Sequence, residues 1–498
     1  MGRPLEPGPE GVMITGGPTG TPLSTAMRIL QVNHQFPPFS SQGSEVYCRN
    51  LSLALAAAGD TVAVFHISNT SPSRPRRLVR GADESLTTYH CIDGGEYSRQ
   101  ANWPNAFLTA SFRQVLREFR PELVHMHNYL SLGDDLVGLA VAEGARVVYT
   151  LHDYGLICPN NLLLRPDGQL CGKGDPAFFE ACCPQTLRVS GGRPPLVAAR
   201  VPSLARWRSF AESYPHRRRR AVLRGAVRLA EGVLGDPQTT AVEAKRAFFQ
   251  GCTGRIAAGT DLFIAPSAYL RQRFVACGLP PERVVHIRYG MVHFQPQPPR
   301  PAGDGRLRFG YIGAFHAHKG IAVLMEAFRG LGERASLHLH GSSFGSPVSE
   351  AHFQRYTADP GNGVVVHGRY DNARIGALLA GLDAIIVPSV WVENSPLTIQ
   401  EAQIAGVPVI TSDQGGMAEL VRDGVDGRLF RLGDGADLRR VLLELIEAPE
   451  QLQRLRAQAP AVPTIAEQSQ RVREHYQAVI AAPRLTSTAA RNSQAQSS

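Results

Sequence analysis

Two carboxylates, Glu393 and Glu401, are separated by seven residues in the segment VPSVWVENSPLTIQEAQIAG, which runs from Val387 to Gly406. Between them, Ser395 suits the N-cap of a helix and Pro396 suits its first position. The free backbone N–H groups of that first turn could hold the negative charge of a diphosphate. Glu401 would lie about one and a half turns into the helix, where it could accept hydrogen bonds from the paired hydroxyls of a ribose. Glu393, in the preceding loop, could hold the hydroxyls of a second sugar.

A glycine and a lysine follow another expected strand, in the segment FGYIGAFHAHKG from Phe309 to Gly320. Gly313 would let the backbone turn tightly at the end of the strand. Lys319 carries a compact positive charge that could reach a phosphate from there. The helix dipole disfavours a lysine in the first turn of a helix, so anion binding is the better interpretation of Lys319.

His152 and Asp153 lie at the end of a third expected strand, in the sequence TLHDY at residues 150–154. In a doubly wound α/β domain, the carboxyl ends of the strands face the ligand. We therefore expect His152 to face the ligand. We expect Asp153 to orient the imidazole of His152 through its other nitrogen.

Two parallel α/β domains are needed to position these segments. Short apolar runs alternate with amphipathic helices along the chain, including a helix expected at 44–58, and this alternation is typical of parallel α/β layers. Strands of a first domain are expected at 28–33, 61–66, 123–127, 146–151, 262–266 and 284–288, and those of a second at 307–312, 336–340, 363–367, 384–387 and 407–411. The predicted fold class is α/β, with two Rossmann-like, doubly wound domains that face each other across a cleft.

The domain boundary is expected near residue 300. The segment from His293 to Gly305 contains four prolines, which exclude a helix or a central strand. We therefore expect a first domain at 27–292, a linker at 293–305 and a second domain at 306–483. Residues 1–26 lack the apolar core of a signal peptide, and residues 484–498 are rich in Ser, Thr, Ala and Gln, so both ends are expected to be disordered.

Composition and missing motifs exclude several classes of protein. The chain has 498 residues, of which 43% are hydrophobic and 19% charged, as in ordinary globular proteins. Neither domain has G-x-G-x-x-G after its first strand, which argues against a nicotinamide or flavin cofactor. No run reaches the roughly 18 apolar residues of a membrane-spanning helix, so a cytoplasmic protein is expected. The net charge of +9 arises from residues 185–255, which hold 14 basic and 4 acidic side chains, so a uniformly basic nucleic-acid-binding surface is excluded.

From about residue 28 to residue 480, the chain resembles the GT-B fold glycosyltransferases of the retaining family 4. The resemblance implies that Glu401 holds the donor ribose, Glu393 the donor sugar, and that Lys319 neutralises the departing diphosphate. It also implies that His152 contacts the donor sugar and stabilises positive charge at the anomeric carbon. The expected catalytic residues are His152, Lys319 and Glu393, and the expected donor-binding residues are Gly43, Gly313, His318, Asn394, Ser395, Pro396, Leu397 and Glu401.

Two glycine turns depart from the family pattern. Family members commonly have Gly-Arg where this chain has Gly313-Ala314, so the usual second cation near the phosphates is missing. His316 or His318 is a candidate to replace it. The family's Gly-Gly-x-Glu loop reads Gln42-Gly43-Ser44-Glu45 here, and Gly43 still allows the backbone to approach a ligand closely.

The resemblance implies a hexosyltransferase (EC 2.4) that moves a sugar from a nucleotide-diphosphate sugar to a glycan or lipid-linked acceptor, as in polysaccharide biosynthesis. The second domain would bind the donor, the first the acceptor, and no metal or cofactor is expected. The resemblance implies retention of the anomeric configuration. No side chain stands out as a covalent nucleophile, so a front-face route is expected, in which the leaving phosphate oxygen accepts the acceptor's proton. Two alternatives remain open. One is a nucleotide-sugar 2-epimerase on the same fold. The other is a nucleotide-sugar-binding protein without catalysis, which is compatible with Ala314 in place of the family's arginine.

Two further features lie outside the expected donor site. Cys158, Cys171, Cys182 and Cys183 fall within 26 residues and could hold zinc, but they lack a C-x2-C pair, so reduced thiols are favoured. The run Arg217–Arg220 is either a solvated helix face or a patch for anionic lipid headgroups. Peripheral contact of this kind at the inner face of a membrane would suit a lipid-linked acceptor.

Overall fold

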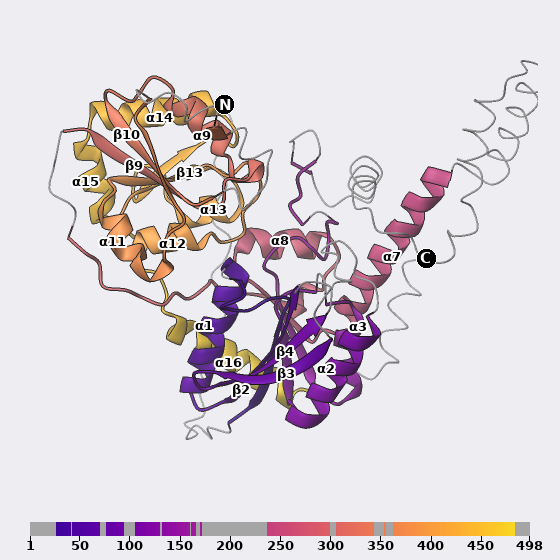
Figure 1. Ribbon diagram of the computed structural model, residues 1–498. Coiled ribbons are helices and arrows are strands. Elements are labelled where there is room, and N and C mark those ends of the chain that lie inside the picture. The colour runs from indigo at the N-terminus through magenta and orange to yellow at the C-terminus, as the bar shows by residue number, and fades with distance from the viewer. Residues whose placement is uncertain are drawn as a thin grey trace, which may run out of the picture.

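The computed structural model consists of two α/β domains, which confirms the predicted fold class (Figure 1). It describes residues 26–40, 42–69, 76–93, 105–129, 132–159, 161–165, 170–171, 237–298, 305–342, 353–354 and 362–483. The expected terminal segments, apart from Ala26, and most of the basic stretch lie outside these residues.

The first domain is built on an eight-stranded sheet. Its order is β3-β4-β2-β1-β5-β6-β7-β8, and every pair is parallel except β3–β4. The strands are β1 (Arg28–Asn33), β2 (Thr61–Asn69), β3 (Arg77–Asp83), β4 (Leu86–Asp93), β5 (Leu123–Met126), β6 (Arg146–Thr150), β7 (Leu262–Ala265) and β8 (Val284–His286). The sequence analysis missed β3 and β4. The edge strand β3 is mostly exposed and therefore has no apolar run to reveal it.

Besides α16 (Ile465–Ala481), the first-domain helices within the described residues are α1 (Gly43–Ala57), α2 (Ala106–Phe119), α3 (Asp135–Ala142), α7 (Pro237–Gly259) and α8 (Ala268–Ala276). Helix α2 begins where the side chain of Asn105 can cap it. Asn105 accepts hydrogen bonds from the N–H groups of Phe107 and Leu108 in the first turn. Its apolar face, with Phe112 and Val115 fully buried, packs into the core beside β2 and β4.

The second domain is built on a six-stranded parallel sheet of order β11-β10-β9-β12-β13-β14. Its strands are β9 (Leu307–Ile312), β10 (Ala335–His340), β11 (Val364–Gly368), β12 (Ala384–Val387), β13 (Val409–Ser412) and β14 (Gly427–Phe430). Its helices are α9 (Ile321–Phe328), α11 (Ile375–Ala380), α12 (Leu397–Ile404), α13 (Gly415–Leu420), α14 (Gly435–Glu447) and α15 (Glu450–Ala457). The four-residue strand β14 was not predicted.

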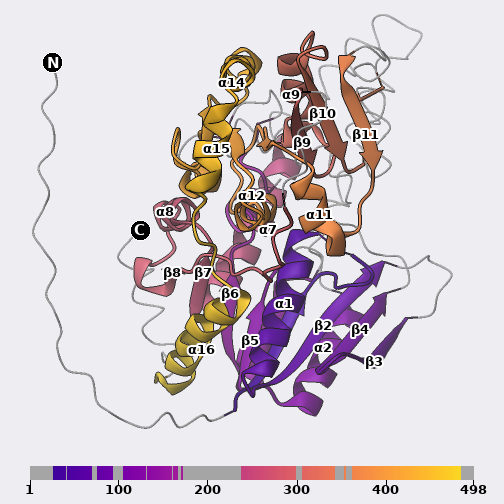
Figure 2. The ribbon, with the colours of Figure 1, turned by 90° about the vertical axis from the view of Figure 1, so that its left-hand side faces the viewer.

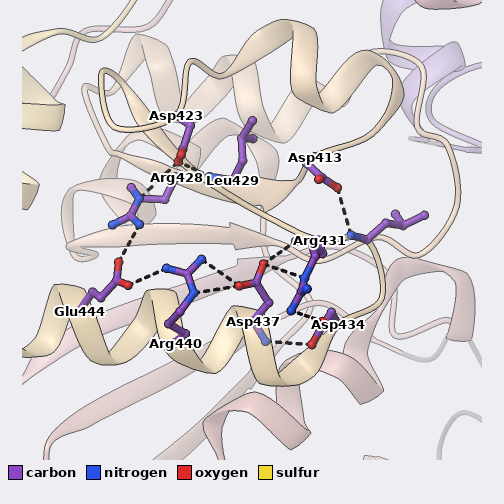
Figure 3. A network of polar contacts seen from close by, with 10 residues as sticks. Asp413, Asp423, Arg428, Leu429, Arg431, Asp434, Asp437, Arg440 and Glu444 are labelled. Atoms are coloured by element: carbon purple, nitrogen blue, oxygen red, sulfur yellow. Dashed lines mark hydrogen bonds and ion pairs between the residues drawn. The ribbon is translucent and has the colours of Figure 1, made fainter. Parts of the chain in front are cut away.

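A polar network ties β14 and α14 to the loop that follows β13 (Figure 3). Arg440 donates hydrogen bonds to Asp437 and Glu444 on its own helix. Glu444 also accepts a hydrogen bond from Arg428 of β14. Asp413, in the loop after β13, accepts the N–H of Leu432 from the loop after β14. The network therefore anchors the Asp413 loop, from which α13 begins.

The last helix, α16 (Ile465–Ala481), belongs to the first domain and not to the second as predicted. Figure 1 and Figure 2 show it, in yellow, beside α1 and the first sheet. Val472 and Tyr476 are fully buried in the core cluster that contains residues of α1, and Arg473 pairs with Asp60. The boundary expected at 483 is therefore wrong for this helix, because an amphipathic pattern shows which face is buried but not which domain buries it.

The chain crosses between the domains twice, and the two crossings touch. Met291 donates its N–H to the carbonyl of Pro463 and accepts the N–H of Ile465, at 2.9 and 2.8 Å. A Cβ atom on Gly290 would lie 2.4 Å from the carbonyl oxygen of Thr464, so only glycine permits this approach. The two crossings are thus held together by backbone hydrogen bonds and a close approach at Gly290.

Candidate functional site

The loop between β12 and α12 reaches from the second domain into the core of the first. Trp391 and Val392 are buried in the first domain's main hydrophobic cluster. Asn394 donates from Nδ2 to the carbonyls of Leu151 and His152, at 3.0 and 3.4 Å, and its Oδ1 accepts the hydroxyl of Ser267. The side chain of Asn394, expected to bind the donor, thus connects the two domains.

Helix α13 makes a second connection between the domains. The carboxylate of Glu419 accepts the N–H groups of Ala268 and Tyr269 at the start of α8, which lies between the domains (Figure 1). Acidic groups stabilise the N-terminal end of a helix. A Cβ atom on Gly416 would lie 1.4 Å from the carbonyl oxygen of Asn394, so α13 packs directly against the β12–α12 loop (residues 388–396), named the donor loop because the sequence analysis expects the donor there.

Glu393, which is buried, forms an ion pair with the partly exposed Lys319. Nζ of Lys319 lies 2.6 Å from Oε1 of Glu393, and the hydroxyl of Ser389 donates to the same oxygen at 2.7 Å. Burial by itself would raise the pKa of Glu393, but the charge of Lys319 and these hydrogen bonds outweigh it and hold the pKa below its ordinary value. Nζ also lies 5.4 Å from the ring centroid of Trp391. The structure therefore brings together two of the three residues predicted to be catalytic.

The position of Lys319 depends on the glycine that follows it. Lys319 ends a 3-10 turn at Ala317–Lys319, and Gly320 has a φ of +74°. A Cβ atom on Gly320 would lie 1.7 Å from the carbonyl oxygen of Pro388, at the start of the donor loop. The turn and the loop can therefore meet only if residue 320 is glycine.

Replacing Gly320 with alanine should destabilise the second domain and weaken donor binding. The new Cβ atom must push the Lys319 turn away from the donor loop, which we expect to cost more than about 2 kcal/mol. Gly330→Ala is the matched control, because Gly330 has a φ of +73° but nothing within 4 Å of its Cβ position. Thermal unfolding of both variants measures how much stability each loses. Equal melting temperatures would show that the close approach of residue 320 to Pro388 does not contribute to stability.

Helix α12 begins one residue later than expected. Pro396 occupies the N-cap and no side chain caps the helix, so the prediction that Ser395 caps it is wrong. The Ser395 hydroxyl instead accepts a hydrogen bond from Gln400 at 3.4 Å. A Cβ atom on Gly43, the first residue of α1, would lie 3.7 Å from Leu397 Cδ1, so the start of α1 faces this end of α12. The first-turn N–H groups of α12 have no capping side chain there.

Glu401 is a buried carboxylate without a partner. It is 8% exposed, and it makes no hydrogen bond or ion pair with the residues the structure describes. Burial raises its pKa to about 7. A carboxylate in this state gains most from a ligand that donates hydrogen bonds, as paired hydroxyls do.

The two histidines near the Gly313 turn do not supply the missing positive charge. Burial and the neighbouring Lys319 lower the pKa values of His316 and His318, that of His318 to about 4. Both rings are therefore neutral near pH 7, because a charge beside Lys319 is unfavourable. Ala314 has no polar side chain, and its carbonyl accepts the hydroxyl of Tyr311. His318 can still offer a hydrogen bond, but neither ring acts as the second cation.

His152 lies at the carboxyl end of β6, as expected, but its ring partners differ from the prediction. Nε2 lies 2.9 Å from Nδ1 of His127, and Nδ1 lies 2.5 Å from the hydroxyl of Tyr289. Asp153 does not orient the ring: its Oδ1 accepts the N–H of Gly155 at 2.7 Å. Burial raises the pKa of Asp153 to about 6 and lowers that of His152 to about 3.

The sequence analysis missed three residues of the site, Ser389, His127 and Tyr289. His127 offered a signal, since it follows β5, whose neighbour in the sheet is β6, and adjacent parallel strands end at the same edge. Ser389 lies four residues before Glu393, but a hydroxyl in a loop has no distinctive pattern. Tyr289 is 137 residues from His152, and no local pattern connects them.

Among the residues that the structure describes, no group of three or more His, Cys, Asp or Glu side chains could hold a metal ion. Cys158 and Cys171 are free thiols, whereas Cys182 and Cys183 lie outside those residues, so the zinc hypothesis remains a prediction. No helix of the described part is long and apolar enough to cross a membrane.

Comparison with known families matches both domains. The model of the family described as "Glycosyl transferases group 1" matches residues 297–462, and that of "Glycosyltransferase Family 4" matches residues 41–177. The first match contains the Lys319 turn and the donor loop, and the second contains Gly43 and His152.

Curated relatives and solved structures agree with these matches. The chain is 27% identical to the amylovoran biosynthesis glycosyltransferase AmsK of Erwinia amylovora, over 38% of this chain and 49% of that protein. It is 28% identical to a D-inositol 3-phosphate glycosyltransferase of Streptomyces griseus, over 40% and 39%. The chain thus matches half or less of the length of these relatives.

Among solved structures, Anabaena HepE in complex with UDP and glucose has a TM-score of 0.57 at 16% identity, covering 91% of this chain and 99% of that one. Sucrose-phosphate synthase from Thermosynechococcus elongatus has a TM-score of 0.59 at 17% identity, covering 91% and 99%. At these identities the likeness concerns the fold.

Proposed function

Because this chain belongs to the GT-B glycosyltransferases of the family 4 type, we propose that it is a retaining hexosyltransferase that uses a nucleotide-diphosphate sugar. The donor would lie mainly on the second domain and the acceptor on the first. HepE, with the same fold, was solved with UDP, UDP-glucose, or UDP and glucose bound. These complexes support a nucleotide sugar as the donor.

The unpartnered carboxylate of Glu401 carries the proposal. It is buried, and it lies on the helix whose N-terminal N–H groups have no capping side chain. A ligand that is both anionic and rich in hydroxyls would satisfy both features at once. The ribose hydroxyls would donate to Glu401, and the diphosphate would accept from the backbone at Leu397.

Lys319 and Glu393 would act on the reacting bond. Lys319 would stabilise the negative charge that develops on the leaving diphosphate. Glu393, held ionised by Lys319 and Ser389, would accept hydroxyls of the donor sugar and place its anomeric carbon. His152, as a neutral ring beside the donor loop, would contact the donor sugar through its edge or its carbonyl, since both of its ring nitrogens are already bonded.

The transfer itself would follow a front-face route. The bond between the anomeric carbon and the diphosphate oxygen breaks as the acceptor oxygen bonds to the same face of that carbon. The acceptor's hydroxyl proton moves to the departing phosphate oxygen, so atoms and charge balance. Lys319 and the α12 backbone N–H groups supply positive character at the diphosphate, and the reaction as proposed needs no metal or cofactor.

The names of two relatives bear on the class of acceptor and on the location of the protein. One relative is named for amylovoran biosynthesis and another for phosphatidyl-myo-inositol mannosyl transfer. They support a glycan or lipid-linked acceptor and a role in polysaccharide biosynthesis. A cytoplasmic protein with peripheral contact to anionic membrane through residues 185–255 fits such an acceptor, and vesicle binding at low salt tests that contact.

A panel of UDP, GDP and ADP sugars tests the proposal. The correct donor should raise the melting temperature of the wild type and not of Glu401→Ala. Addition of acceptors, with proton NMR of the product, should then show retention of the anomeric configuration, with and without EDTA. Inversion, loss of activity in EDTA or a trapped sugar on a carboxylate would contradict the mechanism, and donor epimerisation without acceptor would identify a 2-epimerase instead.

A further inference from the structure

His34 directly follows β1, and both of its ring nitrogens face oxygen atoms. Nδ1 lies 3.0 Å from Oδ1 of Asn33, and Nε2 lies 3.3 Å from Oε1 of Glu45. The amide of Asn33 has a fixed orientation, because its Nδ2 donates to the carbonyl of Ser44 at 3.2 Å and its Oδ1 accepts the backbone N–H of His34 at 2.8 Å. Toward the ring, Asn33 therefore acts as an acceptor.

Glu45 is a fully buried carboxylate in the first turn of α1. Its side chain is 0% exposed, whereas that of His34 is 19% exposed. The hydroxyls of Ser40 and Ser44 donate to its two oxygens, at 3.2 and 3.1 Å. A carboxylate that is removed from water is stable only if hydrogen bonds and a positive charge compensate it. His34 is a basic side chain within ion-pair distance of this carboxylate.

These contacts match a histidine that carries a proton on both ring nitrogens. A neutral imidazole has one donor and one acceptor nitrogen, whereas the imidazolium ion has two donors. If Nδ1 donates to Asn33, a neutral ring turns the lone pair of Nε2 toward the carboxylate of Glu45, which repels it. The doubly protonated ring instead satisfies both oxygens. The cation is then the more exposed member of the His34–Glu45 pair.

His34 lies on the side of the first domain that faces the start of α12. Glu45 is two residues from Gly43, whose Cβ position is 3.7 Å from Leu397 Cδ1, and one end of α1 points toward α12 (Figure 2). His34 is also close to His152. Burial is the main cause that lowers the pKa of His152 to about 3, and the charge of His34 is the next.

We propose that the imidazolium of His34 is the second positive charge at the diphosphate of the donor. Each phosphate of a nucleotide-diphosphate sugar carries a negative charge, and the Gly313 turn supplies no cation besides Lys319 within the described residues. Lys319 approaches the diphosphate from the second domain and His34 from the first. Each cation is held by a buried carboxylate, Glu393 or Glu45. Together they stabilise the charge that develops on the departing diphosphate.

The contact with a diphosphate rests on the proposed function, whereas the charge of His34 does not. Nitrogen-15 NMR of labelled histidines measures that charge without a ligand. In the wild type near pH 7, both ring nitrogens of His34 should have the chemical shifts of protonated nitrogen, and His34→Gln identifies these signals by their loss. One unprotonated nitrogen on the wild-type ring would overturn the proposal.

Replacing His34 with glutamine tests the contact itself. UDP, GDP, ADP and inorganic diphosphate are the probes, with affinities measured by calorimetry near pH 7.5. Loss of the charge should weaken binding of the best nucleotide and of inorganic diphosphate by about tenfold, as expected for a nearby charge in a partly screened site. His338→Gln is the matched control, because both ring nitrogens of His338 also have partners, Ser336 and His367, on β10 and β11.

A cation added on the second-domain side shows whether the two positions share one ligand. Ala314→Arg should raise the affinity for inorganic diphosphate more in the His34→Gln variant than in the wild type, because the first added charge satisfies most of the anion. Equal gains in the two backgrounds would contradict the proposal.

Two outcomes separate this inference from the proposed function. If His34→Gln binds the nucleotides as tightly as His338→Gln does, the inference is overturned and the proposed function stands. If the wild type binds none of the three nucleotides, the proposed function fails. Inorganic diphosphate then decides, because a wild type that does not bind it more tightly than His34→Gln overturns the role of His34.

Discussion

Replacing Lys319 with methionine should lower kcat for sugar transfer by about 10²- to 10³-fold, with a smaller effect on donor binding. The ammonium group lies 2.6 Å from Glu393 beside the donor loop, so its charge matters most when the diphosphate departs. Its loss leaves Glu393 without a cationic partner, while the hydroxyl of Ser389 still donates to Oε1. The pKa of Glu393 should then rise, because burial is no longer offset by a positive charge. Steady-state kinetics from pH 5.5 to 8.5 would measure both effects.

A double-mutant cycle separates the two roles of the lysine. Glu393→Gln removes the carboxylate alone, and the combined variant shows whether Lys319 acts through Glu393 or on the diphosphate directly. Lys319→Arg is the control for charge without the compact ammonium group. If Lys319→Met retains at least a third of the wild-type kcat, leaving-group stabilisation by this residue is excluded.

Replacing Glu401 with glutamine should change how both stability and donor affinity depend on pH. Burial raises the pKa of Glu401 from an ordinary 4.5 to about 7 in the folded protein. Between those two values the unfolded chain has released its proton while the folded protein still holds it. The wild type should therefore lose about 2 kcal/mol of stability from pH 5 to pH 8, and the glutamine variant should not. Melting temperatures of the two proteins across this range provide the measurement.

Donor binding should have the opposite pH dependence. Hydroxyls that donate to Glu401 favour its ionised form, so binding expels the proton, and affinity should fall by up to about tenfold per pH unit below pH 7. The glutamine variant should bind the intact nucleotide sugar weakly at every pH. An intact sugar nucleotide is the proper probe, because the terminal phosphate of a free nucleoside diphosphate titrates in the same range. A wild-type affinity that is independent of pH between 5 and 8 would mean that Glu401 does not contact the donor.

Local patterns in the sequence predicted the strands, loops and helix starts that carry the candidate site residues. Glu393 and Lys319 were singled out because strand ends, glycines and helix starts have characteristic residues, and their roles remain predictions. The small error at Ser395 came from the same source: serine is a good N-cap, but here its hydroxyl bonds Gln400. His316 and His318 were misjudged as candidate cations because charge depends on burial, which a motif does not show.

The sequence by itself determined the two α/β domains, the family and the local elements that present Glu393, Glu401 and Lys319. The tertiary structure alone decided that α16 returns to the first domain and that the ring of His152 lies between His127 and Tyr289. These contacts join residues up to hundreds of positions apart, and their free energy comes from burial and hydrogen bonds that exist only after the sheets have assembled. Periodicity and spacing describe one element at a time, so they cannot show which distant side chain completes a buried polar chain.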